Sequence, residues 1–202
     1  MKSVLENTTI GLVSVFLLLA SAPVASAGVD ADVACQGLKS ATAGKYALCR
    51  LGAVGKGVKK GEAPDYGACD AKLTEKWTKH DDKGGADCPY GNGAQGAVAA
   101  EVTTATDTIA GLVAGSVDPD FKCEVGKLKA AARYIVCRQG TINKALKKGI
   151  GPGFNKCDNN LAGKWSAIEA KHAATCPTVG DVAAIQTEGE THTDAVQVLL
   201  VP

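Results

Sequence analysis

The first apolar segment of the chain is a short run near the N-terminus. Residues 10–20 are apolar except for one glycine and one serine, and the small residues Ala25, Ser26 and Ala27 follow them. Such a run, closed by a small-x-small triplet, is typical of a cleaved signal peptide. A retained membrane anchor is the competing interpretation, but 18 residues barely span a bilayer and Pro23 interrupts them. We expect residues 1–27 to be removed during export.

Long segments without proline then predict helices. The first is expected from about residue 34 to residue 60, because lysines in its last turn, Gly61 and Pro64 together form a stop signal. The second is expected over residues 67–83, where Asp70 in the first turn suits the helix dipole. The two are expected to form an antiparallel hairpin.

A third helix is expected over residues 94–114, although its threonines are poor helix formers. Its counterpart later in the chain, residues 181–200, opens with Asp181, a residue suited to an N-cap. Residues 115–120 contain glycine, proline and aspartate and are expected to be a linker. The fold class predicted is therefore all-α.

The chain also contains an internal duplication. Its eight cysteines form two sets of four with the same gaps of 14, 20 and 19 residues, so each recurs 88 positions later. Other residues recur with them, namely Lys39/Lys127, Tyr46/Tyr134, Arg50/Arg138, Pro64/Pro152, Asp70/Asp158, Leu73/Leu161 and Trp77/Trp165. We interpret residues 28–116 and 117–202 as two tandem units, each a helical hairpin plus a third helix.

An even number of cysteines in an exported chain is typical of disulfides. Within an antiparallel hairpin, bonded residues must be centred on the turn, which lies near Gly61. Cys49 with Cys69 has its midpoint at residue 59, and Cys35 with Cys88 has its midpoint at 61.5. The same reasoning applies to the second unit. The nested pairs expected are Cys35–Cys88, Cys49–Cys69, Cys123–Cys176 and Cys137–Cys157.

Composition explains why such crosslinks are needed. Aromatic residues make up only 4% of the chain, so each unit has little bulky apolar surface to bury. Metal and redox chemistry are not expected, because zinc and iron–sulfur sites need cysteines two to four residues apart and no Cys-x-x-Cys occurs. We therefore expect no cofactor and no metal.

Catalysis also has little support in the sequence. The three histidines, His80, His172 and His192, are not repeated in the other unit, and we expect them to lie on the surface. No known catalytic motif is present. A non-enzymatic protein is the expectation. An enzyme without a recognisable motif is an alternative, for which a cluster of His80, Glu75 and Asp81 in a deep pocket would be the sign.

Charge is segregated along the chain. The net charge is +3 over residues 35–90 and +7 over residues 123–178, but −4 over each of the ranges 91–121 and 179–202. One explanation is that each third helix neutralises its own hairpin. The other is a duplicated basic surface for an anionic polysaccharide or another envelope component, such as lipid headgroups. A chain with net charge +1 and no nucleic-acid motif is not expected to bind nucleic acid.

Two groups of residues are candidates for ligand binding. The first consists of lysines near the hairpin turns, and the second consists of two tryptophans that are expected to pack against the first helix or else to offer a ring for a ligand. The candidates are Lys56, Lys59, Lys60, Lys144, Lys147, Lys148, Trp77 and Trp165. The turn lysines also allow a second alternative, inhibition of a protease through the hairpin turns.

The spacing of the cysteines, together with three short motifs, resembles a repeat that exported bacterial proteins carry in tandem. The motifs are Ala-Gly-Lys-Tyr-Ala-Leu-Cys-Arg at 43–50, Lys-Lys-Gly at 59–61 and Lys-Trp at 76–77. The resemblance covers nearly all of the chain after residue 27. It implies no catalytic or binding residue. The sequence therefore predicts a secreted or periplasmic, disulfide-bonded binding or surface-associated module, without naming its ligand.

Overall fold

The computed structural model describes residues 31–85, 88, 92–114, 121–176 and 178–200. This part of the chain contains six α-helices and no strand, which confirms the all-α prediction. The expected signal peptide and the expected linker lie outside the described residues. The helices are α1 (Ala31–Lys60), α2 (Gly67–Gly84), α3 (Asn92–Val113), α4 (Lys122–Lys148), α5 (Asn155–Lys171) and α6 (Val182–Leu199).

The expected stop signals end the two long helices. Gly61 and Gly149 follow α1 and α4 with positive φ angles of 65° and 62°, a conformation that glycine adopts without steric cost. The Gly149 amide donates to the carbonyls of Ala145 and Leu146 at the end of α4. Each long helix can then turn back into a shorter one.

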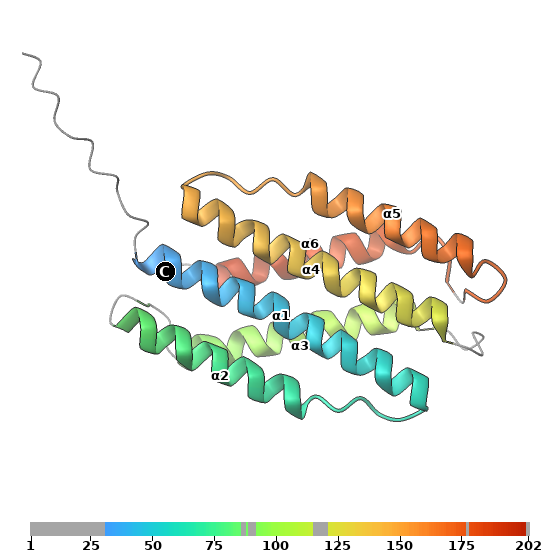
Figure 1. The fold of residues 1–202 in the computed structure, drawn as a ribbon, viewed down its shortest axis with the longest axis horizontal. Helices are drawn as coiled ribbons and strands as arrows, with labels where there is room; N and C mark the ends of the chain where they lie inside the picture. Colours follow the sequence, from blue (N-terminus) through green and yellow to red (C-terminus); the bar gives the residue numbers. More distant parts are fainter. Residues whose placement is uncertain (1–30, 86–87, 89–91, 115–120, 177, 201–202) are drawn as a thin grey trace, which may run out of the picture.

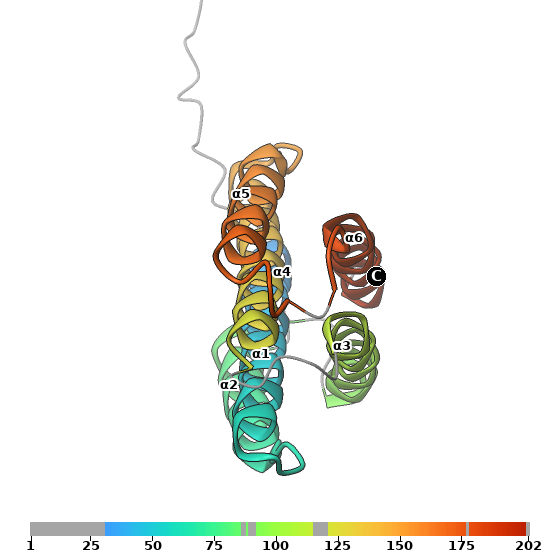
Figure 2. The same cartoon turned by 90° about the vertical axis from the view of Figure 1, so that its right-hand side faces the viewer.

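The six helices form two layers (Figures 1 and 2). One layer contains α2, α1, α4 and α5, in that order across the molecule, so that the two hairpins lie side by side with their long helices in the middle. The second layer contains only α3 and α6, which pack against each other and against α1 and α4. Each third helix thus covers the inner face of its own hairpin.

Helices α1 and α4 are antiparallel and approach closely because small residues line their contact. A methyl group at Gly44 would lie 3.4 Å from the Cα of Val136. Near the start of α1, Gly37 faces Asn143, and near its end Gly55 faces Val125. The residue number on α1 and that on α4 have the same sum in the pairs Gly37 with Asn143 and Gly55 with Val125. Since α4 is the counterpart of α1 in the second half, the two long helices meet with approximate two-fold symmetry.

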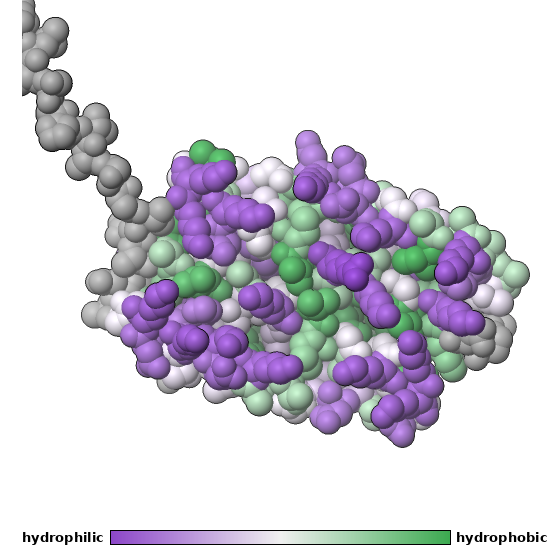
Figure 3. Space-filling model, viewed as in Figure 1, coloured by the Kyte–Doolittle hydropathy of each residue, from purple (hydrophilic) through white to green (hydrophobic). Residues whose placement is uncertain are grey.

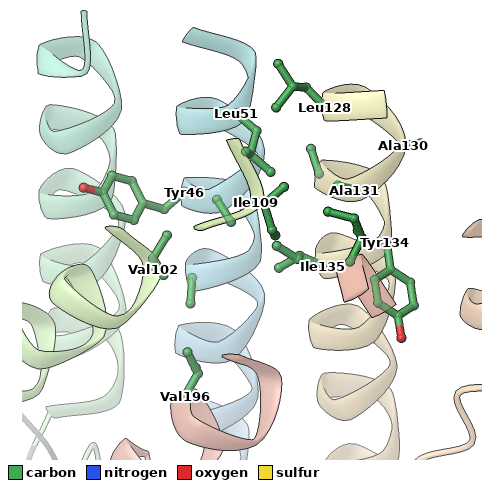
Figure 4. Packing of buried hydrophobic residues seen from close by; sticks show 14 of the residues in the cluster. Tyr46, Leu51, Val102, Ile109, Leu128, Ala130, Ala131, Tyr134, Ile135 and Val196 are labelled. Carbon is green, nitrogen blue, oxygen red and sulfur yellow. The ribbon is translucent and has the colours of Figure 1, made fainter. Parts of the chain in front are cut away.

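One hydrophobic core is shared by both halves (Figure 4). Side chains of Leu51, Ile109, Leu128 and Ile135 meet between the layers, and none of the four is more than 1% exposed. Several alanines complete this core and keep the helices close together. Packing between the halves therefore adds burial that neither hairpin would have alone.

The disulfides join the helices as predicted. Cys49–Cys69 and Cys137–Cys157 link the long and short helices beside each turn, with Cα separations of 5.6 and 5.7 Å. Cys35–Cys88 and Cys123–Cys176 form the outer links, with separations of 5.5 and 5.3 Å. No described cysteine is free. Four such bonds indicate that the protein folds in an oxidising environment.

Candidate functional site

The two tryptophans do not offer a surface to a ligand. Trp77 is 0% exposed and Trp165 is 1% exposed, because both rings are packed between the short helices and the long ones. Their role as a ligand platform, which the sequence left open, is therefore wrong for this structure. The alternative of packing against the first helix of each unit describes their position.

A buried lysine lies over each buried indole ring. The Nζ atoms of Lys39 and Lys127 lie 5.0 Å from the ring centroids of Trp77 and Trp165, respectively. Cation–π contacts of this kind are attractive, and more so when water is excluded. Neither lysine is more than 1% exposed. Each ammonium group must therefore be paired with a carboxylate, because an unpaired buried charge is costly.

The pairing is partly repeated in the two halves. Lys39 contacts Asp81 at 2.6 Å, and Lys127 contacts the corresponding residue, Glu169, at 2.9 Å. Lys127 also contacts Asp181 at 2.7 Å. Burial tends to raise the pKa of Asp181, but hydrogen bonds from Lys127, Thr178 and Trp165 outweigh burial and lower it. Asp181 thus holds α6 against the hairpin, and its side chain does not cap its own helix.

A second repeated cluster surrounds each buried arginine. The guanidinium carbon of Arg50 lies 3.8 Å from the ring centroid of Tyr66, and that of Arg138 lies 3.8 Å from that of Phe154. Tyr46 donates to Asp70 at 2.6 Å, in an arrangement that recurs in the second half between Tyr134 and Asp158. Burial, followed by this hydrogen bond, raises the pKa of both tyrosines. The arginine and the first tyrosine of each cluster are buried, whereas Tyr66, Phe154 and the aspartates reach the surface. These contacts hold the helices of each hairpin together.

The arginines also reach the third helices. Arg50 donates to Thr106 at 3.0 Å and contacts Asp107 of α3 at 3.4 Å. Arg138 contacts Glu190 of α6 at 3.4 Å. These contacts agree with the first explanation of the charge segregation, in which each acidic third helix partly neutralises its own hairpin.

The histidines differ from the expectation that all three lie on the surface. His192 is 0% exposed, and its Nδ1 lies 3.4 Å from a carboxylate oxygen of Glu101 across the contact between α6 and α3. Burial lowers the pKa of His192, and Glu101 opposes this effect. The suggested catalytic cluster does not form either. His80 contacts Thr42, and Asp81 binds Lys39.

The lysines near the hairpin turns are exposed, but the structure does not bring the two sets together. Because α1 and α4 are antiparallel, Lys56, Lys59 and Lys60 lie at one end of the four-helix layer and their counterparts lie at the other (Figure 1). All six lie within the last turns of helices. The protease-inhibitor alternative would therefore present helical lysines and not residues of the loops 61–66 and 149–154.

The long helices α1 and α4 and the third helices α3 and α6 carry opposite net charges. Helix α1 contains six basic residues and one acidic residue, and α4 contains eight and one. Helix α3 contains two acidic residues and α6 contains three, with no basic residue in either. Apart from Asp32, every exposed charged side chain of α1 and α4 is basic. Figure 3 shows the face of the four-helix layer, where hydrophilic side chains flank a more apolar strip.

Two equivalent concavities open beside the inner disulfides. Each concavity is lined by a tyrosine, a leucine, the disulfide and basic residues. Every lining residue of one concavity has its counterpart 88 positions away in the other. Their volumes are about 130 and 80 Å³. The basic residues are Lys45, Lys72 and Lys76 in the first, and Arg133 and Lys164 in the second.

A larger cavity of about 430 Å³ lies where the end of α1, the start of α4 and the end of α5 meet. Val125 and Gly126 belong to its lining, and the other described lining residues are all lysine or histidine. We call it the basic cavity. It is lined by Lys59, Lys122, Lys129, Lys171 and His172 in addition to those two residues. No acidic residue is among the described residues that line it.

Of these five basic residues, the sequence indicates only Lys59 as a candidate for ligand binding. Lys129 and Lys171 contribute to the net charge of the second hairpin but stand out in no other way. The signal that could have found them is the loss of repetition, since Lys122 and Lys129 correspond to Ala34 and Ala41 in the first half. The sequence does not show that these positions converge on the end of α1.

One group of side chains in the described part of the chain has the spacing of metal ligands, namely Cys35, Asp81 and Cys88. The two sulfur atoms belong to the same disulfide, so they are not thiolate ligands. Asp81 is already bound to Lys39. These residues therefore do not fit a metal ion in the oxidised protein.

Comparison of the chain with protein families, curated proteins and solved structures finds no match. The class of protein is therefore defined by the fold itself, an all-α protein with disulfide-bonded helical hairpins. None of the helices in the described residues is long and apolar enough to cross a membrane.

Proposed function

We propose that this protein is an exported, non-enzymatic module that binds an anionic polymer through the layer formed by α2, α1, α4 and α5. In this proposal residues 1–27 are a signal peptide, and the two halves are tandem copies of one unit. The oxidised cysteines support the export, because disulfides form and persist outside the reducing cytosol. The ligand favoured is an anionic glycan of the cell envelope.

The observation that carries the proposal is the opposite net charge of the long helices α1 and α4 and the third helices α3 and α6. Asp107 of α3 and Glu190 of α6 contact Arg50 and Arg138 at 3.4 Å. Apart from Asp32, the exposed charged residues of α1 and α4 are all basic, and we call these basic residues the outer stripe. They are Lys45, Lys56, Lys59, Lys60, Lys122, Lys129, Arg133, Lys144, Lys147 and Lys148. A polyanion that lies along this stripe would meet lysines from both halves. Several weak contacts on one rigid scaffold add their effects, as in other multivalent binding.

The test is retention of the disulfide-bonded protein on immobilised dextran sulfate, followed by elution with salt. Exposed charge–charge contacts are screened as ionic strength rises, so the protein should bind at low salt and elute in a gradient. The variant K56Q/K144Q removes one lysine from each half of the outer stripe. It should elute at clearly lower salt.

The matched control is T104E/T187E. It changes the net charge by the same two units but on the second layer, where both threonines are exposed. The control should elute like the parent protein. Absence of retention at low salt, or equal shifts for both variants, would remove the proposal. Binding to vesicles of anionic lipid without binding to the polysaccharide would replace the glycan by a lipid surface.

A further inference from the structure

The basic cavity breaks the symmetry of the molecule. Two of its lysines, Lys59 and Lys171, have lysine counterparts in the other half, Lys147 and Lys83. The remaining three basic residues do not, because alanine or glycine stands at the equivalent positions. The concentration of charge at this end is therefore not a consequence of the duplicated design.

Helix stability does not explain the cavity either. Lysines in the last turns of α1 and α5, such as Lys59 and Lys171, are favourable because they lie at the negative ends of the helix dipoles. Lys122 is the first residue of α4, where the dipole disfavours a cation. The basic residues around the cavity repel one another, and an anion between them would lower this repulsion.

We propose that the basic cavity binds a pair of phosphoryl groups, such as those on a phosphorylated glycan. Lysine ammonium groups act as compact point charges toward phosphate. Each phosphoryl group carries a charge of about −1.5 to −2 near neutral pH, so a group of lysines attracts a pair of them strongly. The cavity volume of about 430 Å³ lies within the range of small-molecule sites. This inference rests on the proposed function, whose ligand it specifies.

The floor of the cavity gives a direct readout. A Cβ atom at Gly126 would lie 3.2 Å from the side chain of Ile168, so α4 and α5 are in close contact here. The amide signals of Val125 and Gly126 should therefore shift when an anion enters, whereas those beside the inner disulfides should not.

The experiment is a calorimetric titration of the disulfide-bonded protein with tripolyphosphate at fixed ionic strength. The variant K59Q/K171Q should weaken binding about tenfold, which corresponds to about 1.4 kcal/mol. The matched control is K147Q/K83Q, which makes the same changes at the equivalent positions of the other half. It should weaken binding less than twofold.

Equal losses of tripolyphosphate affinity in the two variants would overturn the inference and indicate diffuse attraction by the whole four-helix layer. Amide shifts that are spread over this layer, and not centred on Val125 and Gly126, would overturn it as well. Failure of the proposed function is recognised separately. In that case dextran sulfate does not retain the parent protein, whatever tripolyphosphate does. If dextran sulfate retains the protein but calorimetry finds no site for tripolyphosphate, the proposed function stands and the inference is rejected.

Discussion

Lys127 and Asp181 form an ion pair of 2.7 Å that ties α4 to the start of α6. The lysine is 0% exposed and the aspartate is 13% exposed, so water screens this pair little. Trp165 donates to the same carboxylate oxygen at 2.8 Å, which joins α5 to the contact. One carboxylate therefore connects three helices of the second half.

The variant D181N should lower the free energy of unfolding by about 2–3 kcal/mol, because charged hydrogen bonds to a buried ammonium are lost. Glu169 remains bound to Lys127 and limits the loss. Urea unfolding at neutral pH measures the effect. The matched control is E75Q, which breaks the surface pair of Glu75 with Lys76 and should cause no measurable change. Equal changes in the free energy of unfolding for D181N and E75Q would show that the buried pair contributes no more stability than the surface pair.

The second prediction concerns the close approach of α6 to α4. A Cβ atom at Gly189 would lie 2.7 Å from the ring of Tyr134, so G189A must displace this ring. Overpacking of this kind costs about 1–3 kcal/mol. Thermal and urea unfolding should show the loss.

Gly163 of α5 provides the control for this substitution. An added Cβ atom there meets nothing within 4 Å, and the residue is exposed in a helix. G163A should therefore stabilise the protein by about 0.5–1 kcal/mol, because alanine favours the helix more than glycine does. A destabilising G163A or a neutral G189A would contradict the packing described.

The sequence predicts most of the fold. The helix ends follow from Gly61 and Gly149, whose positive φ angles stop the long helices. The disulfide pairing follows from the equal spacing of cysteines about each turn. The helix ends depend on neighbouring residues, and the disulfide pairing depends on a single hairpin. Both can therefore be predicted from the positions of residues along the chain.

The packing of one half on the other could not be predicted. It depends on Gly37, Gly44 and Gly55, which in the sequence appear only as weak points of a helix. The burial of Lys39 and Lys127 does not follow from the sequence, because lysine is normally a surface residue and only the carboxylates that pair with them in the fold make their burial tolerable. The basic cavity does not follow from it either, because the cavity exists only where the ends of three helices meet.

The third prediction concerns the inner disulfides. Each closes a loop with a sequence separation of 20 residues, so removing one should cost about 3 kcal/mol, mainly through the entropy of the unfolded chain. The variants C49A/C69A and C137A/C157A should lose similar amounts in urea unfolding. A loss in only one of them would show that the two halves differ in how much they depend on the crosslink.

The fourth prediction is a dependence of stability on pH. Burial holds the pKa of His192 below its ordinary value, so the unfolded chain binds this proton more tightly than the folded protein does. The stability that the neutral imidazole contributes is present above about pH 6.5 and is lost as the pH falls toward the folded pKa.

Urea unfolding between pH 7.5 and 5.5 tests this sign. The parent protein should lose stability with a slope of at most about 1.4 kcal/mol per pH unit for this residue. The variant H192Q, which does not titrate, should show a flatter profile. His80 is only partly buried and its pKa is also lowered by burial, so H80Q should flatten the profile less. A steeper profile for H192Q would contradict the assignment.

The last prediction is a gain of binding at the other end of the molecule. Ala34 and Ala41 stand where the second half has Lys122 and Lys129, and Lys147 is the equivalent of Lys59. The variant A34K/A41K should therefore create a second cavity rich in lysine, and calorimetry should find two tripolyphosphate sites per chain where the parent has one.

The second site should be the weaker of the two, because the residue equivalent to His172 is Gly84. A Cβ atom at Gly84 would lie 2.6 Å from the Cβ of Cys88, so the outer disulfide leaves no room for a side chain there. The control T104K/T108K adds the same charge to exposed positions of α3 and should leave one site. If both variants only strengthen the existing binding, net charge determines the affinity, and the arrangement of lysines around the cavity does not.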